Sequence, residues 1–146
     1  AAMGWADWPA RLQRLARGPL IGAREVWVDG GHNPSAARQV ASFAKKQFAG
    51  RPLHLAFASL ETKQPRAMLE PFVGIAEHVH CLPVADHACF APVELAAIAR
   101  SLGFTADAYD ALEEAVASVP NGSPLLIFGS LYLAGTVLAA NGQLPD

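Results

Sequence analysis

Apolar residues are arranged along the chain in two alternating patterns, short unbroken runs and longer stretches at helical spacing. The runs are rich in Val, Leu, Ile and Phe, which is typical of strands covered on both faces of a sheet. In the longer stretches, apolar residues recur three and four positions apart, which indicates helices with one buried face. The predicted strands are residues 25–29, 53–58, 78–83, 105–109 and 125–128, and the predicted helices are 34–48, 66–75, 92–102, 110–119 and 131–140.

Strands alternate with helices from Glu25 onward, and this order predicts an α/β fold with a Rossmann-like, doubly wound, mainly parallel sheet. We expect about six strands, helices on both faces and right-handed crossovers. Residues 11–15 precede a Gly-Pro turn, so we predict that they form an antiparallel edge strand paired with residues 25–29. A chain of 146 residues fits a single domain over residues 1–146, and residues 1–4 resemble a fusion remnant.

Composition narrows the classes of protein to consider. The chain is 52% hydrophobic and 16% charged, far from a disordered composition, and its net charge of −2 argues against a nucleic-acid partner. No apolar run reaches the ~18 residues of a membrane-spanning helix, and no signal peptide opens the sequence, so we expect no membrane partner. Two cysteines, Cys81 and Cys89, are too few for a disulfide framework. We expect two free thiols in a cytoplasmic protein.

The sequence D-G-G-H-N-P at residues 29–34 marks the first strand-to-helix turn. Asn33 is a good N-cap, because its side-chain oxygen can accept from free amides of the first turn, and Pro34 suits the first helical position. Asp29 and His32 should therefore lie between the carboxyl end of a strand and the amino end of a helix. That is where ligands bind in open α/β sheets, and free amides there favour phosphate groups.

Two other connections follow predicted strands, the loop that carries Lys63 and the dipeptide Gly129-Ser130. Because carboxyl ends of parallel strands share one edge of a sheet, we expect both connections near Asp29 and His32. From the residues alone, Ser130 is equally well explained as an N-cap, and Lys63 as a solvated loop lysine. The chain has no G-x-x-x-x-G-K-[ST] loop, no G-x-G-x-x-G turn after the first strand and no G-x-S-x-G elbow.

Histidines and cysteines near residue 80 have the composition of a metal site. The residues are His78, His80, Cys81, His87 and Cys89. Their spacing matches no standard zinc pattern, and Cys81 should lie on the opposite face of its strand from both neighbouring histidines. We therefore expect no metal site here.

Four blocks resemble, in the same order, the carboxyl-terminal domain of the folylpolyglutamate synthase/dihydrofolate synthase family in the Mur ligase superfamily. Residues 29–34 resemble its D-G-A-H-N-P signature, and residues 126–135 resemble its closing G-S-L-Y-L-A-G segment. Residues 8–13 resemble its W-P-G-R-L-Q lead-in, and residues 60–68 resemble a loop usually centred on D-K-D. Gly31 replaces the usual alanine, which we expect to loosen the turn only mildly. Both aspartates that flank the loop lysine are missing.

The resemblance implies an ATP-dependent ligase that joins L-glutamate to dihydropteroate or a folate through an acyl phosphate. It implies ATP and Mg²⁺ as cofactors, with the P-loop and most Mg²⁺ ligands on an amino-terminal ATPase domain that partners this chain. Without that domain, this chain should be inactive. The implied nucleotide-binding residues are Asp29, Gly30, His32 and Asn33. The implied glutamate-binding residues are Lys63 and Ser130. The resemblance implies His32 and Lys63 as catalytic residues and no metal ligand in this chain.

Two other interpretations of the residues stay open. The alternation of strands and helices, with a glycine pair after the first strand, also suits a stand-alone nucleotide- or dinucleotide-binding domain of an oxidoreductase. A non-enzymatic interaction module is the other alternative, with Trp5 and Trp8 as candidate hot spots.

Overall fold

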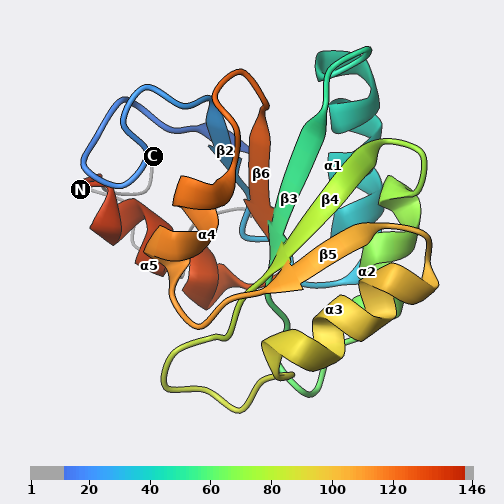
Figure 1. Cartoon of the computed structure of the whole chain (residues 1–146). Coiled ribbons are helices and arrows are strands. Elements are labelled where there is room, and N and C mark those ends of the chain that lie inside the picture. The colour runs from blue at the N-terminus through green and yellow to red at the C-terminus, as the bar shows by residue number, and fades with distance from the viewer. Residues whose placement is uncertain (1–11, 144–146) are drawn as a thin grey trace.

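The computed structural model describes residues 12–143, which form a six-stranded sheet between two layers of helices (Figure 1). The strands are β1 (Gln13–Arg14), β2 (Val26–Val28), β3 (Leu53–Phe57), β4 (Ala76–Cys81), β5 (Thr105–Ala108) and β6 (Leu125–Phe128). Their order across the sheet is β1-β2-β6-β3-β4-β5. Strands β2 to β6 pair in parallel, and β1 pairs with β2 in the antiparallel sense. This confirms the predicted mainly parallel sheet with an antiparallel edge.

Helices cover both faces of the sheet, as predicted. They are α1 (Pro34–Gln47), α2 (Pro65–Leu69), the 3₁₀ helix η2 (Glu70–Phe72), α3 (Pro92–Ser101), α4 (Leu112–Ser118) and α5 (Leu131–Ala140). α1, α2 and α3 lie on one face, and α4 and α5 on the other (Figure 1). Successive residues of a strand point to opposite faces, so Leu126 belongs to the first core and Ile127 to the second. Among residues 12–143, no helix has the length and apolar composition needed to span a bilayer.

The last strand of the sequence, β6, lies between β2 and β3. It pairs with both neighbours in parallel, with Ile127 opposite Val28 and Phe128 opposite Phe57. The chain reaches this position by crossing back over the sheet from β5 through α4. As a result, the carboxyl ends of β2, β6 and β3 are adjacent, at the point where the strand order reverses.

One predicted helix, over residues 66–75, is wrong in its length. α2 ends at Leu69, a 3₁₀ turn follows, and Val73 is extended, with φ −60° and ψ 127°. Pro71 has no backbone N–H to continue the α-helical ladder, and Gly74 adopts a φ of 80° that other residues disfavour. The chain therefore leaves the helix early, and β4 begins at Ala76 instead of the predicted residue 78.

The helix predicted to start at residue 110 begins later, at Leu112, and its N-cap, Ala111, provides no side-chain hydrogen bond. Half of a capping box occurs at the start of α3, where the N-cap Ala91 has no side-chain acceptor of its own. There the Glu94 carboxylate accepts a 2.9 Å hydrogen bond from the Ala91 N–H.

Gly129 allows the turn after β6 to lie against the end of β3. Its φ is 113°, and a Cβ at this position would lie 2.1 Å from the Ala58 carbonyl oxygen. Gly103 has a similar φ of 100°, but a Cβ at that position would have no heavy atom within 4 Å. A comparison of the two positions therefore distinguishes the cost of a positive φ, which both share, from the cost of a steric overlap, which only Gly129 has.

We expect Gly129→Ala to lower the free energy of unfolding by about 1–3 kcal/mol more than Gly103→Ala does. Both substitutions impose an unfavourable φ on alanine, but only the first forces a methyl group into a backbone oxygen. Urea denaturation of the purified chain measures the difference. Equal losses would show that the approach to Ala58 is not the constraint.

Candidate functional site

Three connections that follow the neighbouring strands β2, β6 and β3 meet at one end of the sheet. They bring His32, Lys63 and Ser130 to a common pocket of about 170 Å³. The structure thus gathers three of the predicted site residues, which come from distant parts of the sequence. The pocket is completed by Leu60, Leu131 and Tyr132.

Asp29 does not line this pocket, because its carboxylate folds back into the turn. The side chain is 1% exposed, and its Oδ2 accepts a 2.8 Å hydrogen bond from the Gly31 N–H. A Cβ on residue 31 would lie 2.6 Å from this oxygen and 2.7 Å from the Cβ of Ala36. A methyl group at residue 31 would therefore force Asp29 or Ala36 to shift, and Gly31 permits this close contact between carboxylate and backbone.

Burial raises the pKa of Asp29 to about 6, and the hydrogen bond from Gly31 opposes this shift. The other carboxylate oxygen, Oδ1, is buried and has no hydrogen-bond partner within residues 12–143. The same holds for Nδ1 of His32 in the same turn. Buried polar atoms are costly when unpaired. Each atom therefore favours a partner that the described part of the chain does not supply.

Asn33 and Ser130 cap the two helices that begin at the pocket. The Asn33 side-chain oxygen accepts a 2.8 Å hydrogen bond from the Ala36 N–H, and Pro34 occupies the first turn, as predicted. Ser130 Oγ accepts from the amides of Tyr132 and Leu133, at 3.1 and 3.3 Å. The N-cap explanation of Ser130 is thus correct. Its hydroxyl proton is not used in either contact and can still be donated to a ligand.

Lys63 approaches the pocket from the loop after β3. Its N–H donates to the Leu60 carbonyl at 3.0 Å, which closes a tight turn. The side chain is half-buried, and no carboxylate within residues 12–143 forms an ion pair with it. A lysine ammonium that lacks a counter-ion offers a point charge to a carboxylate or phosphate.

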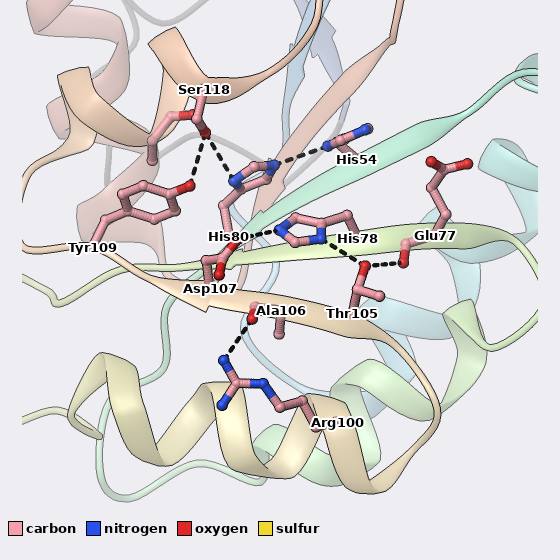
Figure 2. Close-up of polar contacts among 11 residues, drawn as sticks. His54, Glu77, His78, His80, Arg100, Thr105, Ala106, Asp107, Tyr109 and Ser118 are labelled. Atoms are coloured by element: carbon pink, nitrogen blue, oxygen red, sulfur yellow. Dashed lines mark hydrogen bonds and ion pairs between the residues drawn. The ribbon is translucent and has the colours of Figure 1, made fainter.

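A second polar cluster lies away from the pocket, between the sheet and α4 (Figure 2). His80 contacts Nδ1 of His54 at 2.9 Å and Oγ of Ser118 at 3.2 Å, and the Tyr109 hydroxyl donates to Ser118 at 3.0 Å. Burial and the neighbouring His78 lower the pKa of His54, and for His80 they lower the pKa to about 4. This network fastens the end of α4 to the sheet.

The residues considered for a metal site are divided by the fold. Cys81 lies in the core on the opposite face from His80, and burial raises the pKa of its thiol to about 12. His87 and Cys89 belong to the loop after β4. Within the described residues, no three side chains of suitable type converge as metal ligands.

One wall of the pocket is formed by an aromatic residue that was not among the predicted site residues. Tyr132, in the first turn of α5, lines it, and the ring of His87 stacks on Tyr132 with centroids 3.8 Å apart. The position of Tyr132 shortly after Ser130 was a signal for the first residue. His87 contacts it only through tertiary structure, so no local pattern indicated the pair.

The profile of the family "Mur ligase, glutamate ligase domain" matches residues 10–131. The chain belongs to this family. A folylpolyglutamate synthase of Lacticaseibacillus casei is 32% identical over 133 residues, which are 90% of this chain and 29% of that protein. This Mur ligase domain thus spans under a third of the length of that relative.

Two solved structures share the fold of this Mur ligase domain. The folylpolyglutamate synthase of Thermotoga maritima superposes with a TM-score of 0.79 at 25% identity, over 91% of this chain and 30% of that one. A bifunctional folylpolyglutamate synthase/dihydrofolate synthase of Yersinia pestis, complexed with AMPPNP and a manganese ion, gives 0.72 at 20% identity. That match covers 92% of this chain and 32% of the other.

The family assignment does not support the alternative of an oxidoreductase dinucleotide-binding domain. The interaction-module alternative depended on Trp5 and Trp8, which lie outside the described residues, as do residues 8–11 of the lead-in block. The functions of Asp29, Gly30, His32, Asn33, Lys63 and Ser130 remain predictions.

We expect Asp29→Asn to stabilise the isolated chain at pH 7 but not at pH 4. The folded pKa is raised from 3.8 to about 6, so wild-type stability falls as pH rises through this window, whereas asparagine stays neutral. A shift of this size is worth up to about 3 kcal/mol. The measurement is the variant-minus-wild-type difference in the free energy of unfolding at each pH.

The difference also cancels the effect of His54 and His80 on the pH dependence of the free energy of unfolding, which is opposite in sign to the effect of Asp29. Their pKa values are lowered by folding, so they cost stability as pH falls below 6.5 in both proteins. A difference that does not change with pH would contradict the proposed effect of burial on Asp29.

Proposed function

We propose that this chain is the carboxyl-terminal domain of an ATP-dependent ligase that adds L-glutamate to dihydropteroate, to a folate, or to both. Its partner is an amino-terminal P-loop ATPase domain of the same enzyme, and the nucleotide and glutamate bind between the two. The observation that carries this proposal is the convergence of His32, Lys63 and Ser130 on one pocket in a member of the glutamate ligase family.

The size of the pocket supports a site that two domains share. Complete small-molecule sites usually enclose about 300–1,000 Å³. The pocket here measures about 170 Å³, enough for part of a nucleotide or for an amino acid, but not for all reactants together. A second domain that closes over this end of the sheet would enlarge the site and exclude water from a hydrolysable intermediate.

We assign the nucleotide to the turn after β2. Asp29 Oδ1 and His32 Nδ1 are buried without partners in the described residues, and the ribose and phosphates supply groups that satisfy them. Gly30 lets the backbone approach the nucleotide closely. Asn33 caps α1 with its side-chain oxygen, so its amide N–H₂ is the group left to face the nucleotide.

We assign the glutamate to the opposite side of the pocket. The Lys63 ammonium attracts a carboxylate or the transferred phosphoryl group, and the Ser130 hydroxyl donates a hydrogen bond. In the reaction, the γ-phosphoryl group of ATP passes to the substrate carboxylate, which gives an acyl phosphate and ADP. The glutamate amine then attacks the acyl carbon, loses a proton and displaces phosphate. Lys63 and His32 are the catalytic candidates, because both line the pocket to which we assign the phosphoryl transfer.

We assign the binding site for Mg²⁺ to the proposed partner domain. The described part of this chain contains no group of three suitable metal ligands, so its residues do not build a site for the ion by themselves. When bound to the nucleotide, Mg²⁺ would neutralise phosphate charge. The contribution of this chain is to orient nucleotide and glutamate.

We expect Asp29→Ala and His32→Ala, made in the full-length enzyme, to lower turnover at least tenfold, or about 1.4 kcal/mol of transition-state stabilisation. Each substitution removes a polar group assigned to the nucleotide. The assay is glutamate-dependent ATP hydrolysis, with circular dichroism to verify folding. A folded variant with full activity would refute the role of that residue.

We expect the isolated chain to fold but neither hydrolyse ATP nor ligate glutamate. This domain alone supplies only half of the contacts to the nucleotide and the glutamate, and it has no P-loop. Nucleotide affinity should be about millimolar, or about −4 kcal/mol. Calorimetry with ATP and Mg²⁺, beside a phosphate-release assay, tests this. Micromolar binding, or turnover that persists through repurification, would mean that the chain carries a complete site.

A further inference from the structure

The connection between β4 and α3 links the two sides of the pocket. On one side it pairs with the Lys63 loop, because the Ala88 carbonyl accepts from the Glu61 N–H at 3.1 Å. The Phe90 N–H donates to the Ser59 carbonyl at 2.9 Å in the same pairing. On the other side, it carries His87 onto the ring of Tyr132 in α5. This one connection therefore contacts both walls of the pocket.

The contact between His87 and Tyr132 is close and nearly parallel. The ring centroids are 3.8 Å apart and the planes are inclined by 19°. Asp86, the residue before His87, has a φ of 63°, and it is the one non-glycine residue with positive φ in the described part of the chain. Aspartate tolerates this conformation better than most residues. This left-handed backbone conformation immediately precedes the residue that stacks on Tyr132.

Tyr132 needs such support to act as a wall. It is 50% exposed, so packing against its own domain holds the ring only in part. The remaining lining of the pocket is divided by chemistry, with His32, Lys63 and Ser130 as polar groups and Leu60 and Leu131 as apolar ones. This division fits an amino acid whose carboxylate meets the polar groups while its methylene groups pack against the apolar side.

We propose that His87 is a positioning residue for the amino-acid substrate. By stacking on Tyr132, it holds that ring at a fixed distance from Lys63 and so sets the length of the side chain that the pocket accepts. This inference rests on the proposed function, since it concerns the glutamate side of the same pocket. His87 touches Tyr132 and acts through it.

The test is steady-state kinetics of His87→Ala in the full-length ligase. Aromatic stacking of this kind supports about a two- to tenfold effect, so the KM for glutamate should rise by that factor while kcat and the KM for ATP stay unchanged. Preference for glutamate over aspartate and over 2-aminoadipate should fall. His87→Phe keeps a stacking ring and should restore both quantities. Val93→Ala, at an exposed position of α3 that does not line the pocket, is the control.

Coupling between the two rings gives an independent measurement. The double variant His87→Ala/Tyr132→Ala should raise the KM for glutamate no more than Tyr132→Ala alone, because the first residue acts only through the second. Additive effects would overturn the inference, as would failure of His87→Phe to restore selectivity. Unchanged KM and selectivity in folded His87→Ala would overturn it while the proposed function stands. A wild-type enzyme without glutamate-dependent turnover would overturn both.

Discussion

The parallel pairing of β6 with both β2 and β3 is the constraint on which the rest of the structure depends. The apolar residues of β6 face two cores: Leu126 packs under the layer of α1 to α3, and Ile127 packs under α4 and α5. Its backbone bonds to a neighbour on each side. Because it occupies this position, the turns after three sequence-distant strands come together. The close approach of Gly129 to Ala58 belongs to the same arrangement.

The sequence was sufficient to predict each strand but not their order. Runs such as residues 125–128 are short, apolar and bounded by turn residues, so their conformation follows from local composition. The place of β6 depends on which crossover covers which face, and that is decided by packing between distant segments. The early end of α2 is a local effect of Pro71 that helical periodicity conceals, because the apolar residues continue at helical spacing beyond the break.

The same division holds for the site. Asn33 and Ser130 act as N-caps, and this could be predicted because a cap contacts amides only a few residues away. The burial of Asp29 and its contact with Gly31 depend on how the turn packs against α1. The stack of His87 on Tyr132 joins residues far apart in sequence. Neither could be derived without the fold.

The buried carboxyl of Asp29 has a consequence for ligand binding. Its raised pKa means that the free domain holds this proton at mildly acidic pH, where an exposed aspartate would have lost it. A ligand whose hydroxyl groups donate to Asp29 favours the ionised form, so binding must expel the proton into solution. Association with such a ligand is then a proton-releasing equilibrium below about pH 6, and its measured heat should depend on the ionisation enthalpy of the buffer.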